Sequence, residues 1–322
     1  MPHASTTPYD HGITAIDTDY VRPRLDASHL IVASGRAAFV DTGTNYSVPL
    51  LLDALQQQHL VPEHVDYVFL THVHLDHAGG AGLLMQQLPN AVAIVHPRGA
   101  PHMIDPRKLI AGSQAVYGEA AFNKMYGTLE PIDAARVVEA HDEQEFQLAG
   151  RGLRCLHTEG HARHHYVLHD PAAAAVFTGD SFGVSYRELD TDAGAFVFPT
   201  TTPIHFDPDE AHRSIDRIMA CEPEQLFLTH YSRIPGLDKL ADDMHRGIDD
   251  FVEIASRHAT RDDRTGAIER AMFSYLANRA QAHGIELTNE ELQELLVMDI
   301  KLNTQGLEHW LEHGSPTARR PR

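Results

Sequence analysis

The stretch that decides the fold is Thr-His-Val-His-Leu-Asp-His at residues 71–77, in which three histidines and one aspartate fall within six positions. It directly follows the mostly apolar run VDYVFL at 65–70, which predicts a short buried strand. Two glycines come next and lead into a predicted helix over 81–88. Because ligand sites in α/β folds gather where strands end, we expect this cluster to belong to a functional site.

The spacing within the cluster suits metal binding. Side chains two positions apart point the same way in an extended segment, so His72 and His74 can bind one metal. Asp76 and His77 come after a predicted turn and can reach a second metal beside the first. Imidazole and carboxylate are ligands for borderline divalent metals such as zinc. The alternative is a chance cluster in a chain with 24 histidines.

Four further residues, three of them at the ends of predicted strands, favour the metal site over chance. His161 ends the run HTEGH, and Asp180 ends FTGD after an apolar run. His230 ends LFLTH, and Asp41 follows the apolar run AAFV. Each residue alone is typical of a turn or a surface position. Asp41 before the histidine cluster and the other three after it, in this order, give the pattern its weight.

The ordered series resembles the metallo-β-lactamase-fold hydrolases, and especially their glyoxalase II-like branch, over residues 25–235. The resemblance implies an α/β fold, the αββα sandwich, and two divalent metals held by seven side chains. Metal one would be bound by His72, His74 and His161, metal two by Asp76, His77 and His230, and Asp180 would bridge them.

Two positions refine the resemblance. Asp41 matches the family's residue that orients the ligands from outside, a role nearly as important as ligation. A β-lactamase proper often has a cysteine where Asp180 stands, so the match indicates the branch with a bridging carboxylate. The resemblance does not fix the substrate, because one fold hosts many functions.

Composition narrows the choice of partners. The chain has 322 residues and a formal net charge of -19, which disfavours a nucleic-acid partner because phosphate binding needs clustered Lys and Arg. Two cysteines provide no disulfide framework, and Cys155 is expected to be a buried structural thiol. The polar N-terminus and the lack of any apolar run near 18 residues predict a soluble, cytoplasmic protein that does not interact with membranes.

We expect a metallo-β-lactamase-like domain at 1–240, with a helical insertion near 101–131, and a helical C-terminal extension at 241–322. The apolar and aromatic insertion is either a lid over the metals or a segment packed on the outside of the core. The extension, with a capping box at Thr288 and a predicted interruption at Gly306, either packs on the core, walls the site or forms a homodimer surface.

The resemblance implies a hydrolase in which metal-bound hydroxide attacks an ester-like carbonyl of a small molecule: a thioester, lactone or ester. Asp76 is the candidate catalytic residue that relays a proton to the leaving group. Zinc is the expected metal, with iron and manganese as alternatives. The alternative functions are an iron-dependent sulfur dioxygenase with one metal, and a catalytically weak metal-bound regulatory protein. Near His161, we expect His165 to support the ligands and His164 and His169 to be surface residues.

Overall fold

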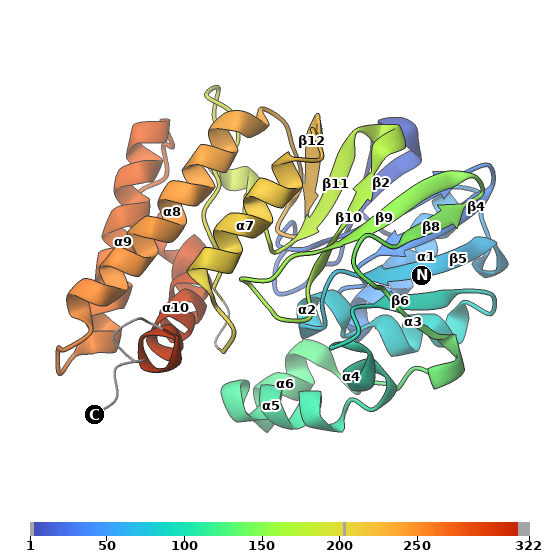
Figure 1. The fold of residues 1–322 in the computed structure, drawn as a ribbon, viewed down its shortest axis with the longest axis horizontal. Coiled ribbons are helices and arrows are strands. Elements are labelled where there is room, and N and C mark those ends of the chain that lie inside the picture. The colour runs from blue at the N-terminus through green and yellow to red at the C-terminus, as the bar shows by residue number, and fades with distance from the viewer. Residues whose placement is uncertain (1–2, 202–203, 315–322) are drawn as a thin grey trace. The chain divides into compact units, whose positions relative to one another are not determined.

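A computed structural model describes residues 3–201 and 204–314, apart from the side chain of Tyr117 (Figure 1). The chain divides into two compact units. Unit 1 consists of Met1–His157, His164–Gly179 and Cys221–Arg233, and unit 2 consists of Thr158–Arg163, Asp180–Ala220 and Ile234–Arg322. Among the described residues, no helix is long and apolar enough to cross a membrane.

The first sheet of unit 1 has seven strands in sequence order. They are β1 (Thr6–Tyr9), β2 (Ile13–Asp17), β3 (Ala27–Ala33), β4 (Arg36–Val40), β5 (Val65–Leu70), β6 (Val92–Val95) and β7 (Val137–Glu139). Strands β1 to β4 are antiparallel neighbours, whereas β4 to β7 run parallel. The strand β5 has the bounds that the sequence predicts.

The second sheet has the order β13-β12-β11-β10-β9-β8. Its strands are β8 (Glu145–Leu148), β9 (Arg151–His157), β10 (Tyr166–Asp170), β11 (Ala175–Gly179), β12 (Gln225–Leu228) and β13 (Ser232–Ile234). Strands β11 and β12 are parallel, and the pairs among β8 to β11 are antiparallel.

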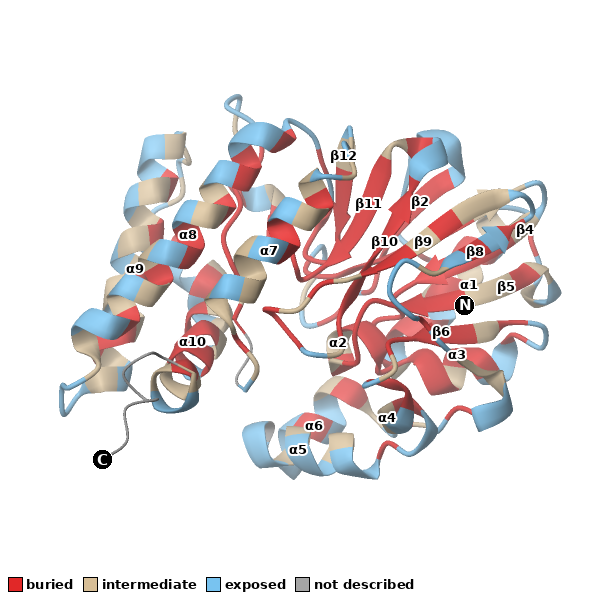
Figure 2. Cartoon of the chain, viewed as in Figure 1, coloured by how far each residue is buried: buried red, intermediate tan, exposed pale blue. Residues whose placement is uncertain are grey.

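A hydrophobic core lies between the two sheets, whose strands are largely buried (Figure 2). Phe69 of β5 belongs to this core together with Tyr166 and Phe177 of the second sheet. The Tyr166 hydroxyl donates a hydrogen bond to the Ile94 carbonyl at 2.8 Å, which satisfies its polar atom inside the core. Cys155 of β9 is fully buried, as predicted, and burial raises the pKa of its thiol, so it remains protonated.

The other face of the first sheet is covered by helices α1 (Val48–Gln57) and α3 (Ala81–Gln87). Leu51 and Leu84 from these helices share a core cluster with Val68 of β5. Because Phe69 faces the opposite way, β5 is buried on both faces. That double burial explains why its sequence is a nearly continuous apolar run.

The segment 101–131 holds three helices of unit 1: α4 (Ala100–Ile104), α5 (Arg107–Tyr117) and α6 (Glu119–Tyr126). The hydroxyls of Tyr126 and Tyr20 lie 2.9 Å apart, and the two rings are stacked. Phe122 packs against Tyr126, and both side chains are 3% exposed. Helix α6 is therefore anchored to the rest of unit 1 by buried aromatic side chains.

Unit 2 contains α7 (Pro208–Met219), α8 (Leu237–His258), α9 (Arg264–His283) and α10 (Asn289–His313). The capping box that was predicted from Thr288 is present, with Glu291 as its partner. The predicted interruption at Gly306 is wrong, because α10 continues through it. Gly306 is buried, and the packing of the helix outweighs the roughly 1 kcal/mol by which glycine disfavours a helical interior.

Candidate metal centre

Three parallel-paired strands of unit 1 deliver polar residues where they end. Asp41 follows β4, the pair Thr71 and His72 follows β5, and the pair Thr229 and His230 follows β12. Buried apolar strands hold these positions rigidly. The carboxyl ends of parallel strands are where ligand sites form in α/β proteins.

The histidine cluster continues from extended backbone into a short helix. His74 has an extended conformation and lies directly before α2 (Leu75–Ala78). Nε2 of His72 and Nδ1 of His74 lie 2.8 Å apart, as the alternation of side chains predicted. Asp76 and His77 lie in the single turn of α2, whereas the sequence predicted them after a turn.

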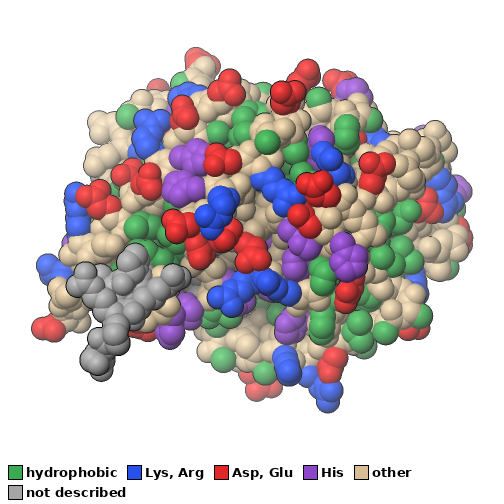
Figure 3. Space-filling view, viewed as in Figure 1, with side chains coloured by type: hydrophobic (Ala, Val, Ile, Leu, Met, Phe, Trp, Pro, Cys, Tyr) green, Lys and Arg blue, Asp and Glu red, His purple; other side chains and the backbone are tan. Residues whose placement is uncertain are grey.

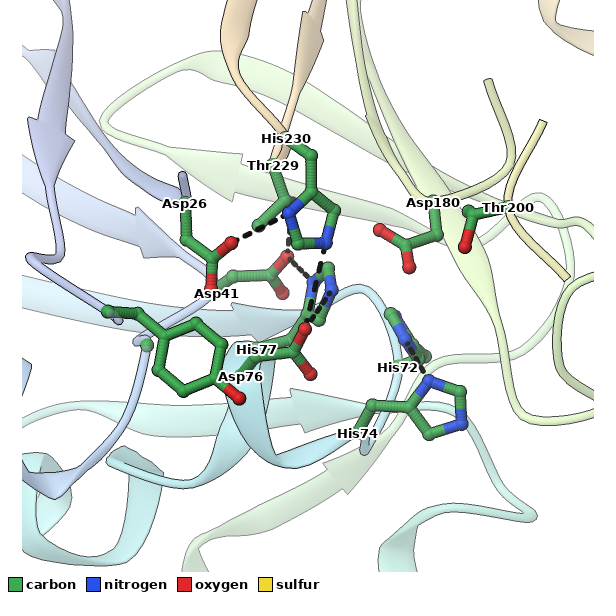
Figure 4. Close-up of polar contacts among 12 residues, drawn as sticks. Asp26, Asp41, His72, His74, Asp76, His77, Asp180, Thr200, Thr229 and His230 are labelled. Atoms are coloured by element: carbon green, nitrogen blue, oxygen red, sulfur yellow. Dashed lines mark hydrogen bonds and ion pairs between the residues drawn. The ribbon is translucent and has the colours of Figure 1, made fainter. Parts of the chain in front are cut away.

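Asp76, His77 and His230 bring three potential ligand atoms together within unit 1 (Figure 4). These atoms all lie within 4.8 Å of one another. The Asp76 carboxylate is 3.8 Å from Nε2 of His77 and 3.6 Å from Nε2 of His230. Two imidazole nitrogens and a carboxylate oxygen at this separation fit a divalent cation such as zinc.

Asp41 connects the ends of the three strands. Its carboxylate accepts hydrogen bonds from the Thr71 amide at 2.8 Å and from the Thr229 hydroxyl at 2.9 Å. It also lies 2.8 Å from Nδ1 of His77. Asp41 has a φ of 56°, which is rare for a residue other than glycine and typical of functional sites. These contacts place the Nδ1 proton of His77 toward Asp41, so Nε2 is the atom that could bind a metal.

Asp26 does the same for His230, and the sequence analysis did not find it. Its carboxylate lies 2.7 Å from Nδ1 of His230 (Figure 4). Asp26 is fully buried, and burial raises its pKa to about 6, although the neighbouring imidazole of His230 opposes the rise. The only signal in the sequence was an aspartate directly before the strand β3, which is too common to single out.

Unit 2 brings together the remaining two predicted ligands. Nε2 of His161 lies 3.2 Å from the Asp180 carboxylate, and both side chains are buried. They line a small cavity of about 20 Å³. Its other lining side chains are largely apolar and include Phe206, Met244 and Ile248.

The neighbouring histidines differ from expectation in one case. His165 is buried and its ring lies 4.8 Å from that of His72, a position from which it could support that side chain. His169 was expected at the surface but lies buried on β10, where it contacts Arg154. Gly179 has a φ of 48°, and a Cβ there would lie 2.7 Å from His165, so this close packing requires glycine.

The chain belongs to the metallo-beta-lactamase superfamily, whose sequence profile matches residues 22–230. A metallo-beta-lactamase fold-containing protein of Sulfurisphaera tokodaii is 29% identical over 227 residues, which is 68% of this chain and 77% of that protein. An atrochrysone carboxyl ACP thioesterase of Aspergillus chevalieri is 28% identical over 172 residues, covering 52% of this chain and 44% of that one.

Solved structures agree on the fold. A metallo-beta-lactamase superfamily protein from Sulfolobus tokodaii has a TM-score of 0.64 at 22% identity and covers 93% of this chain and 99% of its own. A metallo-beta-lactamase family protein from Thermus thermophilus has a TM-score of 0.61 at 18% identity, covering 97% and 92%. The predicted fold class, an αββα sandwich with a helical C-terminal region, is confirmed.

Proposed function

We propose that this protein is a dinuclear metal-dependent hydrolase of the glyoxalase II-like branch, acting on an ester-like carbonyl in a small molecule. The observation that carries the proposal is the convergence of Asp76, His77 and His230. Both imidazoles have a carboxylate on their Nδ1 side, from Asp41 and Asp26 respectively. Carboxylate–histidine pairs of this kind orient metal ligands and raise their basicity.

The seven proposed ligands divide between two metals. One metal would be held by His72, His74 and His161, the other by Asp76, His77 and His230, with Asp180 bridging. Two observations support this assignment. The proposed ligands follow the order that the resemblance implies, and Asp180 lies directly after β11, the parallel neighbour of β12. The nitrogen and oxygen donors favour zinc, with iron and manganese as alternatives.

The chemistry divides between the metals and the chain. Bound divalent cations lower the pKa of a coordinated water and polarise a carbonyl oxygen. Among Asp76, His77 and His230, Asp76 is the most exposed, with 24% of its side chain accessible. We therefore assign to Asp76, the one of the three that a substrate can reach most readily, the relay of a proton to the leaving group. Asp41 and Asp26 keep the imidazoles of His77 and His230 in the tautomer that presents Nε2.

An acyl or aromatic substrate is favoured over a highly charged one. Phe206, Met244 and Ile248 present apolar side chains beside His161 and Asp180. The relative from Aspergillus chevalieri is described as an acyl carrier protein thioesterase, which fits a thioester substrate. On the face shown in Figure 3, Lys and Arg side chains lie among Asp and Glu, which also fits a small-molecule substrate better than a nucleic acid.

A substrate panel tests the proposal. The metal-loaded protein is assayed on acyl thioesters, lactones and aryl esters, with oxygen uptake recorded in parallel. We expect hydrolysis of at least one class, and a fall of about 10²–10⁴-fold in Asp76→Asn, because that is the usual contribution of general acid–base catalysis. Asp66→Asn, at a part-buried ion pair with Arg36, is the matched control.

Two results would contradict the proposal. Oxygen consumption without hydrolysis, with one metal per chain, would indicate the iron-dependent sulfur dioxygenase instead. Full metal loading without turnover on any substrate would indicate a metal-bound regulatory protein. Metal content is measured for each variant, because Asp76 is also a proposed ligand.

A further inference from the structure

Two histidines outside the proposed metal centre face each other on neighbouring helices of unit 2. His212 lies on α7 and His245 on α8, and these helices pack against each other. Their Nδ1 atoms are 2.7 Å apart. The angle between the ring planes is 10° and the centroids are 5.0 Å apart, so the two rings face each other through their Nδ1 edges.

The outer nitrogen of each ring meets a carboxylate. Nε2 of His212 lies 3.2 Å from Asp249, and Nε2 of His245 lies 3.3 Å from Asp216. A carboxylate accepts a hydrogen bond, so each Nε2 carries the proton. A neutral imidazole has only one ring proton, and therefore both Nδ1 atoms would present lone pairs to each other across 2.7 Å. That arrangement is repulsive unless a cation lies between the two nitrogens.

We propose that His212 and His245 form a second metal site, distinct from the centre in the strand ends, for a borderline divalent cation such as zinc, nickel or copper. Imidazole nitrogens are good ligands for all three. Asp249 and Asp216 complete carboxylate–histidine pairs on both sides, the outer support that metal-binding histidines usually have.

The site can open to the size that a metal needs. Zinc–nitrogen bonds are about 2.0–2.1 Å long, so the two Nδ1 atoms must separate slightly to bind one ion. The side chains of His212 and His245 are 27% and 30% exposed, which leaves room for a small rotation. Water can then occupy the remaining coordination positions of the metal.

The site lies next to the cavity of unit 2 in sequence. Ala211 and Met244, the residues directly before the two histidines, both line the cavity that contains His161 and Asp180. A metal held between α7 and α8 would fix the spacing of these two helices. Binding of a metal between His212 and His245 would therefore change the position of the residues that line the cavity.

Zinc titration tests the site in the full chain after its tightly bound metal has been loaded. Calorimetry should detect one further equivalent of Zn²⁺, and His212→Ala and His245→Ala should each lose it. Asp216→Asn with Asp249→Asn should weaken binding by about 10–100-fold, as loss of outer carboxylates does. His258→Ala, at the end of α8, is the control and should bind the additional ion normally.

Two outcomes would overturn the proposal. One is no additional equivalent in the wild type, which would mean that a shared proton alone lies between the rings. The other is an additional equivalent that survives in both alanine variants. Should either variant fail to fold, electron paramagnetic resonance of the wild type with Cu²⁺ replaces it. One additional Cu²⁺ should show coupling to two nitrogens, and its absence would also overturn the proposal.

Discussion

The carboxylate of Asp41 lies 2.8 Å from Nδ1 of His77, and both side chains are buried. The same carboxylate is 2.9 Å from the Thr229 hydroxyl, so one residue connects the ends of β4, α2 and β12. His77 can therefore present only Nε2 toward Asp76 and His230. The geometry of the proposed centre depends on a residue that does not itself bind the metal.

Replacing Asp41 should weaken metal binding without removing a ligand. We expect Asp41→Ala to lower metal affinity by about 10–100-fold, the usual effect of losing an outer carboxylate. Asp180→Ala should lose more metal and more activity, because the proposed bridging ligand would contact both ions. Metal affinity and turnover are measured together for both variants. Equal activity losses with full metal content would show that these roles are misassigned.

Asp26 should behave like Asp41 toward the other histidine. Asp26→Asn keeps the size of the side chain but removes the charge that faces Nδ1 of His230. We expect a fall in metal affinity of about 10–100-fold, measured by competition with a chelator. Asp66→Asn, at a half-exposed ion pair with Arg36, is the control and should bind metal normally. Equal metal affinities of the wild type and Asp26→Asn would show that Asp26 does not support metal binding.

Phe122 in α6 separates the two interpretations of the segment 101–131. Its side chain is buried against Tyr126, so Phe122→Ala should lower stability by about 3–5 kcal/mol. A thermal melt and Michaelis kinetics are compared with those of Val116→Ala, which is 48% exposed. A changed KM with an unchanged melting temperature would instead favour a lid. The side chain of Tyr117, in the same segment, lies outside the part of the chain that the structure describes.

Acid should destabilise the protein through His29. Burial among Phe177 and Phe227 lowers the pKa of His29 from 6.5 to about 4. The folded state therefore binds fewer protons than the unfolded state between these values, and stability falls as the pH drops from 6.5 to 4. The contribution is about 3 kcal/mol, since one pKa unit corresponds to about 1.4 kcal/mol.

Chemical unfolding of the wild type and His29→Gln across this pH range measures that contribution. The free energy of unfolding should depend less steeply on pH in the variant. Histidines that titrate elsewhere affect both proteins alike, so the difference isolates His29. Parallel pH profiles would show that His29 is not held neutral by burial.

Much of the fold was predictable because its signals are local. The buried run before His72 was long enough to define β5, and Thr288 with Glu291 formed the capping box that marks the start of α10. The approach of His72 to His74 follows from strand alternation alone. Gly306 was misjudged because its helix is maintained by packing, which the local sequence does not record.

The outer residues of the sites depend on contacts between distant parts of the chain. Asp26 meets His230 across more than two hundred positions, where the fold brings the start of β3 beside the end of β12 and the Ala27 amide donates a hydrogen bond to the Thr229 carbonyl at 2.8 Å. His212 and His245 lie on separate helices, and no motif links them. Their contact depends on how α7 packs against α8, which a single sequence does not specify.

The number of tightly bound metals per chain tests directly whether the centre is dinuclear. Elemental analysis is done on the His212→Ala, His245→Ala double variant, so that the site between α7 and α8 contributes nothing. We expect about two tightly bound metals per chain, and fewer when His230→Ala is added. A value near one metal per chain that His230→Ala leaves unchanged would contradict the dinuclear centre.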